Sequence, residues 1–180
     1  MMKLNRIIAP MALAASAALS SCSSDKDKAP TCPYAAVLAP VSTLTTFQPD
    51  KTDDPAGELY TVGIVHVETK CDFDPDNGTT NSSLEIRFKA KHAPTEGAKE
   101  YRVPYFVAVA LDGKILNKRD VWLRFGFPPG SPTTTFTDSV ASIVVNLENG
   151  KRPYDYEIVV GFQLTKDQLD YNKKMSRYTL

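Results

Sequence analysis

The feature that most constrains the fold of this chain is the strict alternation of side chains over residues 84–91. Apolar and charged residues take turns there: Leu84, Ile86, Phe88 and Ala90 alternate with Glu85, Arg87, Lys89 and Lys91. A period of two is typical of a β-strand with one face on a core and the other face in water.

Further segments have the composition of strands, and turn residues separate them. Residues 60–69 are rich in β-branched side chains, and residues 121–127, 140–147 and 156–164 are also apolar. Asp112-Gly113 is a tight-turn signal, with a return strand opening at Ile115-Leu116, and residues 148–153 are a second turn. The spacing predicts an all-β fold, an immunoglobulin- or fibronectin-like β-sandwich of about seven strands.

Residues 101–111 are apolar at both alternating positions, which predicts a strand in the middle of a sheet. Pro104 has no N–H for a ladder hydrogen bond, so it predicts an edge, a bulge or a strand start near Tyr105. The one helix we expect is short and C-terminal. Thr165 and Gln168 fit a capping box, and we expect Leu169 to pack against one end of the sandwich.

The amino-terminal segment has the three parts of a secretory signal peptide. Lys3 and Arg6 precede an apolar run over residues 7–19, which is shorter than the roughly 20 residues of a membrane-spanning helix. The run ends in Leu19-Ser20-Ser21-Cys22, which resembles the lipobox of bacterial lipoproteins. The alternative is an ordinary signal peptide with an incidental cysteine.

The lipobox resemblance implies cleavage before Cys22, a diacylglycerol thioether on its sulfur and an acylated amino terminus, with palmitate as an expected chain. Two or three acyl chains hold a protein stably on a membrane. Ser23 rather than Asp favours the outer membrane over the inner membrane by the sorting rule of enteric bacteria. The predicted organisation is a signal peptide over residues 1–21, a lipidated tether over 22–31 and one periplasm-facing sandwich domain over 32–180.

Cys32 and Cys71 remain after lipidation, and an even pair in an oxidising compartment predicts a disulfide. Such a bond closes a 40-residue loop (71 − 32 + 1) and stabilises the fold by about 4 kcal/mol in the chain-entropy view. Free reactive thiols are the alternative, although no C-x-x-C spacing favours a redox role.

Charge and composition exclude several classes of protein. The 21 basic residues balance 21 acidic ones, whereas a nucleic-acid binder normally has a basic excess. Two histidines leave little material for a transition-metal site. We therefore expect no cofactor and no nucleic-acid partner.

The acidic segment over residues 72–78 is a candidate calcium loop, since Asp72, Asp74 and Asp76 offer hard oxygen ligands at alternate positions. It resembles the start of an EF-hand loop, but its sixth position is Asn77 and its twelfth is Ser83 instead of a bidentate Glu. A solvated hairpin loop is the competing interpretation.

No catalytic constellation is evident. His66 and His92 lack a nucleophile or carboxylate at a known spacing, and the G-x-S-x-G, H-E-x-x-H and P-loop motifs are absent. The aromatic residues form either a ligand platform or, as we favour, part of the core; they are Tyr101, Tyr105, Phe106, Trp122, Phe125, Phe127, Tyr154, Tyr156 and Phe162. The loop over residues 127–132 is a candidate partner contact or a simple connection.

Several segments resemble uncharacterised lipoproteins of alphaproteobacteria. They are residues 104–109, 160–165, 167–169 and 171–172, together with Cys32-Pro33 and Cys71. The resemblance covers most of the mature chain, implies a cell-envelope location and supplies no activity or ligand.

The leading hypothesis is thus a non-enzymatic lipoprotein, anchored in the membrane and acting as a binding or envelope-assembly module with an envelope protein partner. A calcium-dependent binding module and an envelope enzyme with an unrecognised site are the alternatives.

Overall fold

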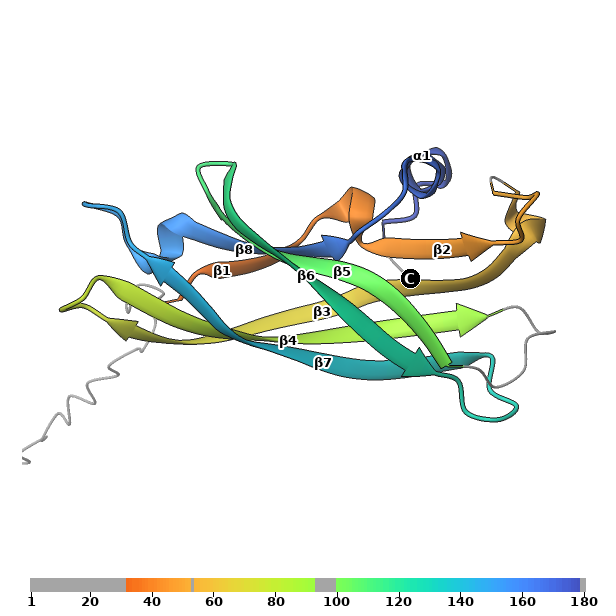
Figure 1. Cartoon of the computed structure of the whole chain (residues 1–180), viewed down its shortest axis with the longest axis horizontal. Coiled ribbons are helices and arrows are strands. Elements are labelled where there is room, and N and C mark those ends of the chain that lie inside the picture. The colour runs from red at the N-terminus through yellow and green to blue at the C-terminus, as the bar shows by residue number, and fades with distance from the viewer. Residues whose placement is uncertain (1–31, 53, 93–99, 179–180) are drawn as a thin grey trace, which may run out of the picture.

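The computed structural model describes residues 32–52, 54–92 and 100–178, and these form a sandwich of two four-stranded sheets (Figure 1). Sheet A has the strand order β1-β8-β5-β6 and sheet B the order β2-β3-β4-β7. The strands are β1 (Tyr34–Val37), β2 (Thr43–Phe47), β3 (Glu58–Asp74), β4 (Thr79–His92), β5 (Glu100–Leu111), β6 (Lys114–Gly126), β7 (Thr133–Asn146) and β8 (Tyr156–Phe162). The predicted all-β sandwich is confirmed, with eight strands in the described part instead of about seven.

The strand bounds differ from the expected ones mainly at the ends. The strand expected at residues 60–69 extends over Glu58–Asp74, and the one expected at 140–147 begins at Thr133. The two short strands β1 and β2 were not predicted, because four or five residues are too few to establish a period. β1 is parallel to β8, and the chain then crosses to sheet B through the 3-10 turn η2 (Ala39–Val41). Two further 3-10 turns precede β3 and β8; they are η3 (Pro55–Gly57) and η4 (Pro153–Asp155).

β5 lies in the middle of sheet A, as its sequence predicts, with β8 on one side and β6 on the other. Pro104 is inside this strand and not at an edge. Its carbonyl accepts a hydrogen bond from the Gln163 N–H at 3.0 Å, just beyond the end of β8. Because the N and C=O of one residue face the same neighbour in an antiparallel strand, the missing N–H of Pro104 falls where β8 has ended.

The predicted turn at Asp112-Gly113 is confirmed and joins β5 to β6 with Leu111 opposite Lys114. Both turn residues have positive φ, 50° for Asp112 and 75° for Gly113, as two-residue hairpins with the right-handed strand twist require. β6 continues without a break to Gly126, so the segment at residues 121–127, which the sequence left as a continuation or a separate strand, is its continuation and ends one residue earlier.

The core lies between the sheets and is filled by alternate residues of every long strand. Phe88 is at its centre, with ring centroids 5.5 Å from Tyr105 and 6.0 Å from Phe162. The hydroxyl of Tyr105 donates to Asp138 Oδ2 at 2.9 Å, so the buried phenol is satisfied. Burial first, and then this hydrogen bond, raise the pKa of Tyr105.

The expected C-terminal helix is α1 (Lys166–Met175), and its capping box is formed as predicted. The Gln168 N–H donates to Thr165 Oγ1 at 3.3 Å and the Thr165 N–H donates to Gln168 Oε1 at 3.0 Å. Leu169 is only half-buried, and the fully buried residues of α1 are Tyr171 and Asn172. No helix in the described residues has the length and apolar character of a membrane span.

Candidate functional site

The outer surface of sheet A is the candidate site, and the strand register defines its residues. Alternate residues of each strand point into the core, so those between them face outward. We call the outward set the apolar face: Tyr34, Ala36, Leu38, Glu157, Val159, Gly161, Arg102, Pro104, Phe106, Ala108, Ala110, Ile115, Lys118, Asp120, Trp122 and Arg124.

Small side chains form the floor of the apolar face. Ala108, Ala110 and Val159 are buried on the outer side of the sheet, where they form a small cluster of their own with Ala36 and Phe106. Gly161 belongs to the same floor, because Val41 of η2 and the ring of Phe106 cover it. A Cβ atom at Gly161 would lie 2.4 Å from Val41 Cγ2, so glycine is required for this close approach.

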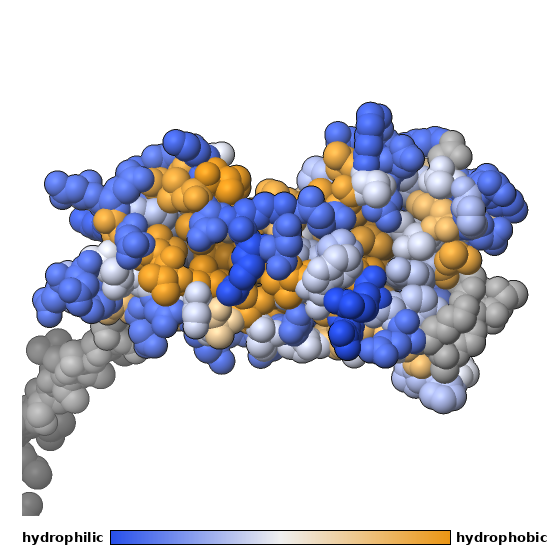
Figure 2. All heavy atoms as spheres, viewed as in Figure 1, coloured by the Kyte–Doolittle hydropathy of each residue, from blue (hydrophilic) through white to orange (hydrophobic). Residues whose placement is uncertain are grey.

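A groove of about 350 Å³ runs along this floor. Its walls come from the β5–β6 hairpin on one side and from η2 and α1 on the other, and the surface is hollowed between the hairpin and α1 (Figure 2). The lining is aliphatic and aromatic except for Lys118 and Gln163; it consists of Leu38, Val41, Phe106, Ala108, Ile115, Phe162, Leu164 and Leu169.

Lys118 is the polar group at the rim of the groove. Its Nζ donates to Gln163 Oε1 at 2.6 Å, lies 3.2 Å from Asp120 Oδ1 and sits 4.9 Å from the ring centroid of Phe106. The side chain therefore covers part of the apolar groove with its methylene stem while its charge stays at the surface.

An aromatic and cationic cluster occupies the other end of the face. Trp122 is 59% exposed, and the guanidinium of Arg102 lies over its indole at 5.1 Å. Arg102 stands directly opposite Arg124 in the β5–β6 register, and within the described residues neither makes an ion pair. Like charges directly opposite each other destabilise a sheet, so this pair suits an environment rich in anions.

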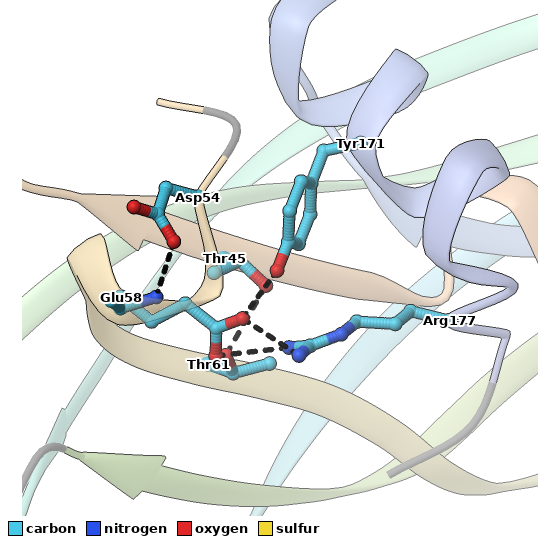
Figure 3. A network of polar contacts seen from close by, with 7 residues as sticks. Thr45, Asp54, Glu58, Thr61, Tyr171 and Arg177 are labelled. Atoms are coloured by element: carbon cyan, nitrogen blue, oxygen red, sulfur yellow. Dashed lines mark hydrogen bonds and ion pairs between the residues drawn. The ribbon is translucent and has the colours of Figure 1, made fainter. Parts of the chain in front are cut away.

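A polar network holds α1 in place beside the groove (Figure 3). Tyr171 donates to Glu58 Oε1 at 2.5 Å, and Arg177 contacts the same carboxylate with Nη2 at 2.7 Å from Oε1 and Nη1 at 3.0 Å from Oε2. Burial first, and then the hydrogen bond to Glu58, raise the pKa of Tyr171 to about 12. Because α1 supplies Leu169 to the groove, this network positions one wall of the candidate site.

Side-chain amides complete the attachment of α1 to sheet B. Gln168 Nε2 donates to the Thr45 carbonyl at 2.9 Å, and Asn172 Nδ2 donates to the Thr43 carbonyl at 2.7 Å. Beneath them the hydroxyls of Thr45 and Thr61 lie 3.1 Å apart. These residues form a structural contact, in which the Asn172 Oδ1 atom is buried without a hydrogen-bond partner in the described part of the chain.

The disulfide between Cys32 and Cys71 is confirmed, with the two Cα atoms 5.6 Å apart. It joins the residue two positions before β1 to the end of β3, so it ties the start of the domain to sheet B as the sequence predicts. The lipidation site predicted at Cys22 lies outside the described residues.

The acidic segment forms the hairpin between β3 and β4. Asp72 lies in β3 opposite Asn81, whereas Asp76 is in the turn. Asp74 Oδ1 accepts from the backbone N–H groups of Asp76 and Asn77, both at 3.1 Å, and its Oδ2 accepts from Asn77 Nδ2 at 2.7 Å. These bonds, led by the Asn77 side chain, lower the pKa of Asp74.

Both carboxylate oxygens of Asp74 thus accept hydrogen bonds within the turn. In the ranges that the structure describes, no group of three or more His, Cys, Asp or Glu side chains is arranged to hold a metal ion. Calcium binding by this loop stays a prediction for calorimetry with millimolar calcium.

The two histidines lie apart. His66 is exposed on β3 beside a bulge, opposite Arg87. His92 packs edge-on against Phe127 at 4.4 Å, its Nε2 lies 3.1 Å from the Ser131 carbonyl oxygen, and its N–H donates to the Pro132 carbonyl. His92 thereby braces the loop over residues 127–132, whose tip is exposed.

Most of the aromatic residues pack in the core, as we favoured. Tyr105, Phe125, Phe127, Tyr156 and Phe162 are buried, and Tyr101 stacks on Phe125 at 5.4 Å. Trp122 and Phe106 differ, because both belong to the apolar face. The sequence itself indicates the outward position of Trp122. Trp122 has the same parity as Asp120 and Arg124, whereas the core parity belongs to Val121, Leu123 and Phe125.

Comparison of the chain with models of protein families, with curated proteins and with solved structures found no match.

Proposed function

We propose that this protein is a lipoprotein of the bacterial envelope, anchored through Cys22, facing the periplasm from the outer membrane, and acting as a non-enzymatic binding or assembly module. Its contact surface in this proposal is the apolar face. The inner membrane is the less favoured location, since Ser23 follows the lipidated cysteine.

The observation that carries the proposal is the apolar outer surface of sheet A. An antiparallel sheet with one solvated face normally alternates apolar-in and polar-out. β5 instead places Pro104, Phe106, Ala108 and Ala110 on its outward side. A contiguous apolar patch on a soluble domain marks a contact with a protein, a ligand or a membrane.

The anchor and the disulfide support an envelope location independently of that surface. Cys32 follows the lipidated position by ten residues (32 − 22), a length that spans at most about 35 Å when extended. The disulfide then holds that attachment point on the folded domain. Disulfides persist in oxidising compartments such as the periplasm.

Fractionation with mass spectrometry tests the anchor. We expect the native protein in the outer-membrane fraction with a diacylglyceryl group on Cys22, and the Cys22→Ala variant in the soluble periplasmic fraction. An unmodified Cys22 thiol, or equal membrane retention of the variant, would refute this part of the proposal.

Binding through the apolar face is tested separately on the soluble Cys22→Ala chain. At a high concentration of isolated envelopes we expect part of it to sediment, through a weak affinity that the dilution during fractionation reverses. Ile115→Asp should abolish this sedimentation, since Ile115 is 49% exposed at the groove and an exposed position accepts a charge at little cost in stability. Thr135→Asp, on the exposed outer side of β7, is the matched control and should sediment normally. Equal sedimentation of the two variants would remove the apolar face as the contact surface.

A further inference from the structure

We propose that the apolar face lies on the bilayer that holds the lipid anchor, so that sheet A rests on the membrane surface and sheet B faces the periplasm. This inference rests on the proposed function, because it requires the anchor at Cys22, and it names what that surface binds.

The tether joins the domain where the two sheets are linked, since Cys32 is bonded to Cys71 of β3 and β1 of sheet A begins two residues later. Tyr34, the first residue of β1 and a member of the apolar face, follows Cys32 by two residues. The ten-residue tether reaches at most about 35 Å from the anchor, so the whole domain stays beside the membrane. A tethered surface meets its partner at a high effective concentration, and even a weak affinity then gives a mostly docked population.

The residue types on the face match a membrane interface. Trp and Tyr are enriched at the boundary between headgroups and acyl chains. Tyr34 is 67% exposed and Trp122 59% exposed, at opposite ends of the face, and Leu38 and Ile115 on its two edge strands are also exposed. These side chains have no apolar cover within the described part of the chain.

The arginine pair supplies charge complementarity. Arg102 and Arg124 stand opposite each other next to Trp122, and Glu100, two positions along β5, is not within ion-pair distance of either. Guanidinium groups bind phosphate oxygens with two parallel hydrogen bonds. Phospholipid headgroups would therefore relieve the repulsion between the two arginines, at the depth where the indole is expected to sit.

The concave shape favours lipid over a second copy of this chain. The β5–β6 hairpin and α1 rise on both sides of the groove (Figures 1 and 2). In a two-fold contact the rims of one copy would have to enter the hollow of the other. A fluid bilayer fills such a hollow with acyl chains and headgroups, while the polar rims, which include Asp112, Lys114 and Lys166, stay in the headgroup layer.

The protein carries its own reporter for this docking. Trp122 is its single tryptophan, so all indole fluorescence comes from the apolar face. We would place the lipidated protein in vesicles of phosphatidylethanolamine and phosphatidylglycerol and measure quenching by aqueous acrylamide and by brominated phospholipids. We expect acrylamide quenching to be about threefold or more weaker than for the soluble Cys22→Ala chain, as a mostly docked tethered face implies. Bromolipids should quench the emission, which should shift to shorter wavelength.

Two variants and a dilution series make the result specific. Ile115→Asp should restore acrylamide access in the anchored protein, whereas Thr135→Asp on the outer side of sheet B should not. The protection should be independent of the protein-to-lipid ratio. Protection that disappears on dilution in lipid, without bromolipid quenching, would assign the face to a second copy and overturn the inference.

Failure of the anchor and failure of the docking are distinguishable. If Cys22 is lipidated but Trp122 is as accessible to acrylamide as in the soluble chain, the anchor stands and the docking is wrong. If Cys22 is unmodified, the proposed anchor is wrong. The docking is then tested separately by coupling the Cys22 thiol to a maleimide lipid in the same vesicles. An accessible Trp122 in that coupled protein would likewise overturn the docking.

Discussion

The outer surfaces of sheets A and B belong to one sandwich, yet they differ in how apolar and charged side chains are distributed over them. Sheet B exposes charged residues at alternate positions of its central strands; they include His66, Glu68, Lys70 and Asp72 on β3 and Glu85, Arg87, Lys89 and Lys91 on β4. On the outer side of sheet A small apolar residues of β5 and β8 are buried beneath larger neighbours, of which Tyr34, Leu38, Ile115 and Trp122 are exposed. Charged residues also lie on this side; they are Arg102, Lys118, Asp120, Arg124 and Glu157. Since burial in the core is common to both sheets, the difference indicates different surroundings of the two outer surfaces.

The cations of the two surfaces are also arranged differently. On sheet B, Lys89 lies between Gly63 and Thr135, so its cross-strand neighbours are uncharged. On sheet A, Arg102 faces Arg124 directly. Sheet B also has an opposed pair of like charge, but it is anionic, Glu68 opposite Glu85. The opposed pairs of the two surfaces therefore attract ions of opposite sign, cations on sheet B and anions on sheet A.

The largest expected effect comes from breaking the covalent link between the sheets. Replacing both Cys32 and Cys71 with Ser should lower the free energy of unfolding by about 4 kcal/mol, because the unfolded chain loses a closed 40-residue loop (71 − 32 + 1). β1 should loosen first, and with it the Leu38 wall of the groove on sheet A. Urea denaturation of the soluble chain measures this loss; a change below about 1 kcal/mol would show that the bond does not constrain the fold.

Introducing a carboxylate on the outer surface of each sheet in turn allows a direct comparison of the stability that each substitution costs. Ala108→Asp should lower the free energy of unfolding by about 2–3 kcal/mol, since Ala108 is only 1% exposed and its cross-strand neighbour Lys118 already contacts Asp120 and Gln163. Thr135→Asp should change it by less than about 0.5 kcal/mol, as is usual for an exposed position. Thermal or urea unfolding measures both, and equal losses would contradict the contrast between the sheets.

Alkaline pH tests the helix that connects the two surfaces, since α1 packs on β2 of sheet B and lines the groove of sheet A. The pKa of Tyr171 rises from 10.0 to about 12 in the folded protein. A raised folded-state pKa stabilises the fold fully below pH 10, and this contribution is lost as the pH rises to about 12. Between those two pH values Tyr171 should account for a loss of about 2 kcal/mol.

The Tyr171→Phe variant is the control for that loss. Phenylalanine keeps the packing against Phe47, whose ring lies 4.7 Å away, but has no proton to release. The variant should therefore lose less stability than the native protein between pH 10 and 12 in urea unfolding. Parallel pH profiles would show that burial and the Glu58 contact do not raise the pKa of Tyr171.

The smallest expected effect on stability separates folding from docking. Arg124→Glu replaces a like-charge pair with an opposite-charge pair, so the soluble domain should gain a few tenths of a kcal/mol. The same variant should dock less tightly on anionic vesicles, because it removes a cation from the apolar face. A variant that is less stable, or that docks more tightly, would contradict the role given to the arginine pair.

The sequence predicted those elements whose residues follow a regular local pattern from end to end. β4 alternates without error, and the turn at Asp112-Gly113 and the capping box of α1 each depend on a few neighbouring residues. Local patterns of this kind predict the structure well because the residues that form the pattern also contact one another in the fold. The strand β1 is too short for a pattern and is held by its pairing with β8, more than 100 residues away.

The candidate site could be predicted only in part. Residues 101–111 are apolar at both parities, which correctly indicates a central strand, and residues 107–111 are buried on both faces. Only the register with β6 and β8 shows that Phe106, Ala108 and Ala110 lie on the outer side, with no further layer of the described chain over them. Leu169 was expected to anchor α1, but Tyr171 and Asn172 have longer-range polar partners that no spacing rule indicates.

Photo-crosslinking in living cells tests most directly whether the two outer surfaces have different surroundings. A benzophenone amino acid is placed at position 115 on the apolar face or at position 135 on sheet B, in the otherwise native, lipidated protein, and adducts are identified by mass spectrometry. We expect phospholipid adducts at position 115 and none at position 135. Equal lipid labelling at both positions, or no lipid adduct at position 115, would contradict the assignment of the apolar face to the membrane.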